Sequence, residues 1–153
     1  MPVLYLSCYI NHNKDSYYRL LQSVRDDKTW SEWVVFMLRA VAKTAQNSLV
    51  LVNGIKNLQQ TYKQEIRGHF PKIYSQDLIN NIFKHPYTKI TFLQKDLNVS
   101  RVTASRYLEQ LAKNGFLERY KHGREIYYLN NKLVALLINV KNMKEQRSTV
   151  QKQ

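Results

Sequence analysis

The chain has 153 residues, of which 44% are hydrophobic, and 24 Lys and Arg against 11 Asp and Glu give a formal net charge of +13. This composition excludes a wholly disordered chain, and the length allows one domain or two small ones that share a core. Residues 1–80 hold 10 basic and 6 acidic side chains, a net charge of +4, whereas residues 81–153 hold 14 and 5, a net charge of +9. The basic second half indicates an anionic partner, with nucleic acid ahead of an acidic membrane surface.

The residue types that usually carry chemistry are sparse. A single cysteine, Cys8, has no partner for an internal disulfide, which fits a reducing cytosol, so we expect a cytoplasmic protein in which Cys8 packs as a small apolar side chain. No apolar stretch is long enough to span a membrane, and the N-terminus lacks the pattern of a secretory signal. We therefore predict no catalytic residue, no cofactor and no membrane partner. We also predict no metal site, because ligand spacing is missing among the four histidines His12, His69, His85 and His122.

The first half of the chain is predicted to be helical. A helix is expected over residues 16–25, with the Asp15 or Asn13 side chain as its N-cap. Thr29 followed by Glu32 has the spacing of a capping box, which predicts the start of a longer helix.

This longer helix has an apolar stripe whose members are three or four residues apart. The stripe residues singled out as a core or oligomer contact are Val34, Met37, Val41, Ala45, Leu49 and Val52, and the spacing continues through Ile55, Gln59, Tyr62 and Ile66. Gly68 and Pro71 are expected to end the helix. An apolar stripe of this length needs a partner, which leaves three alternatives: the preceding helices, a second copy in a homodimer, or a missing part of a larger protein.

After a linker at residues 67–74, the predicted elements are short and closely spaced. In chain order they are a Ser75-capped helix to Lys84, an extended stub at Lys89–Ile90, a Thr91-capped helix over 92–97, a Ser100-capped helix to Asn114, a strand over 116–120, a hairpin loop over 121–124, a return strand over 125–129, and a final helix capped by Asn130.

This order of elements resembles the winged helix-turn-helix family. The resemblance rests on FLQKDLNVSRVTASRYLEQLAKNGFLERYKHGREIYYL, residues 92–129. Asn98 stands where many members have glycine, but asparagine tolerates the left-handed conformation that the turn needs. The expected fold is mainly α: an N-terminal helical segment with one long helix, followed by a winged helix-turn-helix domain with a small β-hairpin.

The second helix of this motif is expected to place its polar start on double-stranded DNA. Ala104, Leu108 and Leu111 have core spacing, so the opposite side near the N-terminus is free for the major groove. The predicted DNA contacts are Ser100, Arg101, Thr103, Ser105 and Arg106 on this helix and Lys121, His122 and Arg124 at the wing tip. The alternative is that these side chains are solvated charges on a fold that serves protein contacts.

The N-terminal half has a second resemblance. The segment PVLYLSCYINHNKDSYYRLLQSVRDDKTWSEWVVFMLRAVAKTAQ, residues 2–46, resembles the helices that follow the catalytic motif in Fic (filamentation induced by cAMP) proteins, and many bacterial members end in a winged helix. The resemblance implies the C-terminal portion of an enzyme that transfers AMP from ATP to a protein hydroxyl. The catalytic motif, His-Pro-Phe followed by Gly-Asn-Gly-Arg, is absent. His85-Pro86-Tyr87 imitates only its opening, and Ile-Thr-Phe-Leu occupies the Gly-Asn-Gly-Arg positions at 90–93.

The expected organisation is a helical segment over 1–70, a winged helix-turn-helix domain over 71–140 and a flexible polar tail over 141–153. The favoured function is a non-catalytic DNA-binding module that forms a homodimer. The alternative is an inert C-terminal part of a protein adenylyltransferase whose winged helix serves protein contacts or dimerisation. In that case its partner is the missing N-terminal catalytic part.

Overall fold

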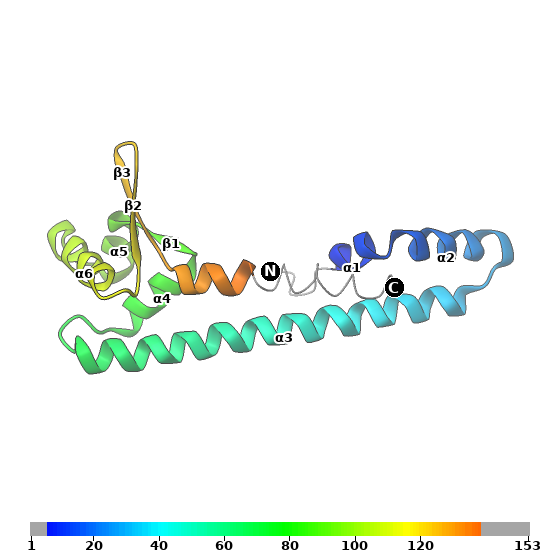
Figure 1. Ribbon diagram of the computed structural model, residues 1–153, viewed down its shortest axis with the longest axis horizontal. Helices are drawn as coiled ribbons and strands as arrows, with labels where there is room; N and C mark the ends of the chain where they lie inside the picture. The colour runs from blue at the N-terminus through cyan, green and yellow to red at the C-terminus, as the bar shows by residue number, and fades with distance from the viewer. Residues whose placement is uncertain (1–5, 139–153) are drawn as a thin grey trace. The chain divides into compact units, whose positions relative to one another are not determined.

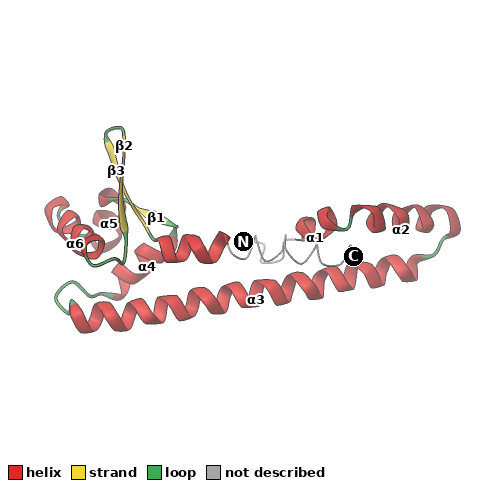
Figure 2. Ribbon diagram, viewed as in Figure 1, coloured by secondary structure: helices red, strands yellow, loops and turns green. Residues whose placement is uncertain are grey.

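A computed structural model describes residues 6–138, and residues 1–5 and 139–153, which include the tail predicted to be flexible, lie outside the described part. The chain divides into two compact units, Met1–Asn53 with Asn142–Gln153 and Gly54–Lys141. The expected mainly α fold is confirmed, and Figure 2 shows helices in both units and strands in the second unit alone among the described residues. The domain limits expected from the sequence remain predictions.

The first unit begins with α1 (Leu6–His12) and α2 (Lys14–Asp27). The helix predicted over residues 16–25 is therefore confirmed as α2, but the predicted side-chain cap is wrong. Asn13 is the N-cap residue of α2 without a capping side-chain bond, and its amide instead donates to the Tyr9 carbonyl at 2.9 Å. Because the Asn13 side chain satisfies the end of α1, it is not available for the start of α2.

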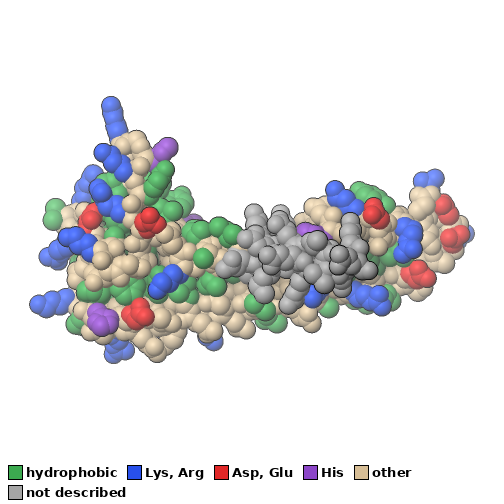
Figure 3. Space-filling model, viewed as in Figure 1, with side chains coloured by type: hydrophobic (Ala, Val, Ile, Leu, Met, Phe, Trp, Pro, Cys, Tyr) green, Lys and Arg blue, Asp and Glu red, His purple; other side chains and the backbone are tan. Residues whose placement is uncertain are grey.

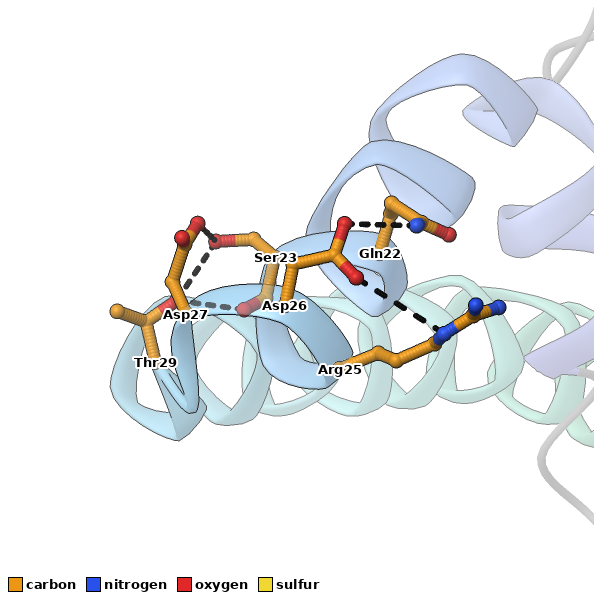
Figure 4. A network of polar contacts seen from close by, with 6 residues as sticks. All are labelled: Gln22, Ser23, Arg25, Asp26, Asp27 and Thr29. Carbon is orange, nitrogen blue, oxygen red and sulfur yellow. Dashed lines mark hydrogen bonds and ion pairs between the residues drawn. The ribbon is translucent and has the colours of Figure 1, made fainter.

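The turn between α2 and α3 (Trp30–His69) is closed by side chains (Figure 4). The Thr29 hydroxyl lies 2.6 Å from the Ser23 hydroxyl and also donates to the Ser23 carbonyl at 3.3 Å. Lys28 in this turn adopts a left-handed conformation, with φ of 55°. Thr29 is thus bound to the end of α2, which differs from the predicted capping box with Glu32.

Within the first unit, one face of α3 is buried at a spacing of four residues: Phe36, Ala40 and Thr44. The Phe36 ring centroid lies 5.6 Å from that of Tyr9 and 6.2 Å from that of Tyr17. The Thr44 hydroxyl is satisfied by the Ala40 carbonyl at 2.8 Å, so burial leaves no polar group unpaired there. This buried face is adjacent to the stripe expected from the sequence and does not coincide with it.

The predicted stripe is largely open in this part of the helix. Val34, Val41, Leu49 and Val52 are exposed, and Met37 and Ala45 are half-buried. Leu38, which the stripe did not include, is also exposed, with 62% of its surface accessible. The first part of α3 therefore has an inner apolar face that is covered and an outer apolar face that is not covered by described residues.

The second unit has the order of a winged helix-turn-helix domain. Its elements are the end of α3 from residue 54, then α4 (Gln76–Lys84), β1 (Tyr87–Thr88), α5 (Ile90–Leu97), α6 (Arg101–Lys113), β2 (Glu118–His122), β3 (Glu125–Leu129) and a helical segment at 131–138. The described strands form an antiparallel sheet in the order β1-β3-β2. In Figure 1 the β2–β3 hairpin projects away from α4, α5 and α6.

Several predicted boundaries in this unit are wrong by one or two residues. The extended stub lies at Tyr87–Thr88, and α5 begins at Ile90 after Lys89, so Thr91 is inside the helix and does not cap it. The strand predicted from residue 116 begins at Glu118, because Phe116 and Leu117 turn into the core. In contrast, the predicted caps Ser75 and Asn130 are confirmed, since each side chain accepts from the amide three residues further along the chain.

The core of the second unit is formed by fully buried side chains from α3, α4, α5, α6 and the sheet, including Tyr62, Ile66, Leu78, Ile79, Leu93, Leu108, Leu111 and Tyr128. Tyr62 connects the end of α3 to this core, because its hydroxyl donates to the Phe116 carbonyl at 2.9 Å. The 131–138 helix packs beside Gly54, since a Cβ there would lie at the ordinary contact distance of 3.4 Å from the Leu136 side chain. The end of α3 is therefore part of the folding unit of the winged helix.

Candidate nucleic-acid interface

The turn between α5 and α6 holds the two helices of the motif. Asn98 closes α5 with φ of 52° and ψ of 45°, the left-handed conformation. The Val99 amide donates to the Gln94 carbonyl at 3.3 Å across this turn. The expectation that asparagine replaces the usual glycine here is confirmed, because few other side chains tolerate this conformation.

Ser100 forms the start of α6. Its hydroxyl accepts from the Thr103 amide at 3.1 Å and lies 2.9 Å from the Thr103 hydroxyl. The predicted cap is confirmed, and the remaining free amides of the first turn point toward the N-terminal end of the helix. The Ser100 and Thr103 hydroxyls are hydrogen-bonded to each other, so they stabilise the N-terminus of α6.

The outward side of α6 is formed by the residues opposite Ala104, Leu108 and Leu111, which are fully buried as predicted. Arg101 and Arg106 are exposed, and Thr103 and Ser105 are half-buried.

The sequence reasoning overlooked Val102, which is 79% exposed. Val102 and Arg106 are four residues apart and therefore share the outermost face of the helix. The signal was present in the sequence, because an apolar residue that lies off the Ala104–Leu108–Leu111 stripe has no core to enter.

The tip of the wing is formed by the other predicted contacts. Lys121 and His122 end β2, Arg124 lies in the turn, and all three side chains are exposed. Gly123 occupies the turn position with φ of 58°. Figure 3 shows Lys and Arg side chains gathered on and around this hairpin. The structure thus places the predicted residues in two groups, one on α6 and one at the wing tip.

The wing is joined to the start of α5 by a polar contact at the first residue of β3, which the sequence did not reveal. The Lys89 Nζ lies 2.7 Å from Glu125 Oε2, and the Tyr127 hydroxyl donates to the same oxygen at 2.6 Å. The hydrogen bond from Lys89 holds the pKa of Glu125 below its ordinary value, and the same bond raises the pKa of Lys89. Lys89 and Glu125 are 36 residues apart, so only the folded chain brings them together.

A second contact joins the wing to α6. The Glu109 Oε1 lies 3.1 Å from Arg119 Nε and accepts from the Tyr128 hydroxyl at 2.7 Å. Burial first, and then the hydrogen bond to Glu109, raises the pKa of Tyr128 to about 12. Because Arg119 pairs with Glu109, its positive charge compensates the negative charge of this carboxylate. The carboxylate therefore repels an anionic partner less strongly.

The sequence of the second unit matches a known family. Residues 58–133 match the family described as the C-terminal domain of protein adenylyltransferase SoFic-like. The chain carries the C-terminal domain of a Fic-family protein. The predicted relationship is thereby confirmed, although the matched residues cover the end of α3 and the winged helix, whereas the resemblance noted in the sequence rested on residues 2–46.

This Fic-family domain is matched over a range that contains both groups of candidate residues, those on α6 and those at the wing tip. Within residues 6–138, no group of three or more His, Cys, Asp or Glu side chains is arranged to hold a metal ion. In the same part of the chain, no helix combines the length and apolarity needed to cross a bilayer.

Proposed function

We propose that this Fic-family C-terminal domain binds double-stranded DNA, with α6 as the helix that enters the major groove. The observation that carries the proposal is the outward side of α6 near its N-terminus, where Arg101, Val102 and Arg106 are all exposed. A helix-turn-helix reads DNA with these positions of its second helix. The net charge of +9 on residues 81–153 supports an anionic partner.

Each exposed side chain on α6 has a distinct role in this proposal. The Arg106 guanidinium has the fork of donors that pairs with the O6 and N7 atoms of guanine, and Arg101 at the helix start meets a base or a phosphate. The Val102 methyl groups suit the methyl group of thymine, which is the apolar feature of the major groove. The half-buried Ser105 and the cap pair Ser100 and Thr103 position the helix and offer weaker contacts.

The wing contributes affinity and little sequence preference. Lys121, His122 and Arg124 stand at the end of a hairpin and are exposed, so they can reach a neighbouring phosphate or the minor groove. Contacts of this kind neutralise phosphates and release counterions, and therefore make binding depend on salt.

The test is fluorescence anisotropy of labelled duplexes over a salt series. We expect Arg106→Ala to weaken binding to the preferred sequence by about 1–3 kcal/mol, and Lys121→Ala to weaken binding evenly across sequences and to lower the salt slope by about 1. Arg39→Ala is the matched control, because Arg39 is also exposed but lies in the first unit. Equal binding by the Arg106→Ala and Arg39→Ala proteins contradicts the proposal.

If no duplex binds even at low salt, the alternative of a protein-contact domain within a protein adenylyltransferase is favoured. In that case the partner is the catalytic part of the enzyme or a second copy. Cross-linking of this chain to a purified Fic catalytic domain distinguishes these two partners.

We also propose that the outer face of α3 pairs two copies of the chain. The support is the row of exposed apolar side chains Trp30, Val34, Leu38, Val41, Leu49 and Val52. The charged residues of this stretch, Glu32, Arg39 and Lys43, lie on other sides of the helix, so two copies can meet through the same apolar face about a twofold axis. A dimer would present two copies of α6 to two half-sites.

A further inference from the structure

The sheet of the second unit has an inner and an outer face. Tyr128 of β3 points inward and is fully buried, so its neighbour Tyr127 points to the outer face. Tyr120 of β2 lies directly opposite Tyr127 in the register, and Tyr87 of β1 lies opposite Leu129, two residues further along the same face. The outer face therefore presents a tyrosine from each of the three described strands.

Three rings on this face are exposed, and each lies beside another of them, the half-buried ring of Tyr127 or the ring of His122. Tyr120 is 56% exposed, Tyr87 is 41% exposed, and Phe92 at the start of α5 is 38% exposed. The Tyr87 centroid is 5.6 Å from that of Tyr127 and 6.4 Å from that of Phe92. At the other side, Tyr120 and His122 stack with centroids 6.5 Å apart and planes at 11°. We call these five residues the aromatic face.

Several basic side chains accompany the aromatic face. The Lys89 ammonium lies 4.4 Å from the ring centroid of Tyr127, which belongs to the middle strand, and it is paired with Glu125. Arg124 is exposed in the turn that follows His122, whereas Lys121 alternates with Tyr120 and His122 along β2 and points to the opposite face. Rings that can stack on bases and cations that can bind phosphates thus occur together on the hairpin, β1 and the start of α5.

We propose that the aromatic face binds single-stranded nucleic acid, with bases stacked on Tyr120 and Tyr87 and phosphates at Lys89 and Arg124. Stacking requires the flat side of a base, which a duplex hides inside its own stack and a single strand leaves open. The face therefore selects unpaired nucleotides, whereas α6 offers donors for the edges of paired bases. This second site shares His122 and Arg124 with the proposed duplex contact of the wing, but it does not involve α6 and goes beyond the duplex-binding proposal.

The charge of the surface favours nucleic acid over a protein partner of similar apolarity. The aromatic face belongs to the half of the chain with a net charge of +9. Two acidic side chains share this face: Glu125 is bound by Lys89 and Tyr127, and Glu118 accepts from the Asn131 amide. A single strand supplies a phosphate with every base, so it satisfies the rings and the cations together.

The test is the anisotropy of a fluorescein-labelled oligothymidine of about 12 nucleotides, within the range of site sizes of single-strand binding folds. Tyr120→Ala is expected to lower the affinity by about 5- to 150-fold, the loss that follows from one stacked base. Tyr120→Phe keeps the ring and is expected to retain the affinity. Tyr18→Ala is the matched control, because Tyr18 of α2 is 63% exposed in the first unit and should not affect binding.

The same titrations with a labelled duplex separate this site from α6. We expect Tyr120→Ala to leave duplex affinity unchanged and Arg106→Ala to leave oligothymidine affinity unchanged. Tyr87→Ala is a second variant on the same face, and the circular dichroism of each variant verifies that the domain is folded. The proposal is overturned if oligothymidine does not bind at low salt, if Tyr120→Ala binds it as tightly as the unaltered protein, or if Arg106→Ala weakens both ligands equally.

Discussion

At the scale of single residues, the second unit is stabilised by buried polar side chains that are each fully engaged. Tyr62 donates to the Phe116 carbonyl at 2.9 Å and to Asn130 Oδ1 at 3.3 Å. The same Asn130 oxygen accepts from the Leu133 amide at 3.1 Å, and the Asn130 amide donates to the Ile82 carbonyl at 3.3 Å. These bonds connect α3, α4, the segment between α6 and β2, and the last helix through two side chains.

Replacing Tyr62 by phenylalanine is expected to lower the free energy of unfolding by about 1–3 kcal/mol. The ring contacts with Phe83 and Phe116 remain, but the buried Phe116 carbonyl loses its donor. Urea denaturation followed by circular dichroism measures the change. Tyr18→Phe, which alters an exposed tyrosine, is the control, and an equal midpoint for the two variants contradicts this account.

Tyr62 also predicts a loss of stability at alkaline pH. Burial raises the pKa of Tyr62 from 10.0 to about 12, with a smaller contribution from Glu65. The unfolded chain therefore releases this proton before the folded chain does, so the stabilising contribution is complete below pH 10.0 and disappears as the pH rises to about 12. Urea midpoints across this range should fall more for the unaltered protein than for Tyr62→Phe, and parallel curves would argue against the assignment.

At the scale of elements, the wing depends on its contacts with the two helices of the motif. A hairpin of two strands has little stability alone in water. Here it is joined to α5 by the ion pair of Lys89 with Glu125, and to α6 by the ion pair of Glu109 with Arg119. These contacts set the direction of the wing tip relative to the outward face of α6, because they connect the hairpin to both helices of the motif.

Glu125→Gln is expected to loosen the wing without unfolding the domain. The substitution removes the charge that holds Lys89, so amide hydrogen exchange should become faster in β2 and β3 and stay unchanged in α4. Low pH should loosen the wing as the substitution does. Because the pKa of Glu125 is lowered, the stabilisation by its charge is complete above the ordinary pKa of 4.5 and is lost as the pH falls through the lowered pKa. Unchanged exchange in both conditions would show that the pair does not hold the wing.

The turn between α5 and α6 gives a prediction of its own. Asn98→Ala should destabilise the domain by about 1–2 kcal/mol, because alanine pays the full steric cost of φ at 52°. Asn98→Gly should be neutral or slightly stabilising, since glycine adopts this conformation freely. Thermal unfolding of the two variants provides the comparison, and equal midpoints would contradict a steric origin.

At the scale of the whole molecule, the described residues leave one large apolar surface open, the outer face of α3 in the first unit. Monomeric proteins seldom expose contiguous apolar patches of this kind. The inner face of the same helix stretch is covered, since Phe36 and Ala40 are buried. The proposed association with a second copy therefore uses this outer face.

Leu49→Glu is expected to convert an associated protein into a monomer, because it places a carboxylate in the middle of the outer face, where Leu49 is exposed. Lys43→Glu introduces the same group on another side of α3 and should leave association intact. Light scattering over a concentration series measures the mass of both proteins. If the unaltered protein stays monomeric at high concentration, the proposed dimer is contradicted.

What the sequence by itself determined was local. The caps Ser75, Ser100 and Asn130 and the left-handed Asn98 could be predicted because each acts on backbone groups within three or four residues. The core side of α6 followed from its spacing for the same reason, and the order of elements then indicated the winged helix.

Only the tertiary structure decided which apolar face of α3 is buried, where β2 begins and how the wing is held. The sequence offered α3 two adjacent apolar faces, and the contacts of Phe36 with α1 and α2 selected between them. Phe116 and Leu117 read as strand residues but enter the core, and Lys89 finds Glu125 across 36 residues. The aromatic face likewise depends on strand register, because rings distant in the chain become neighbours only when β1, β3 and β2 pair.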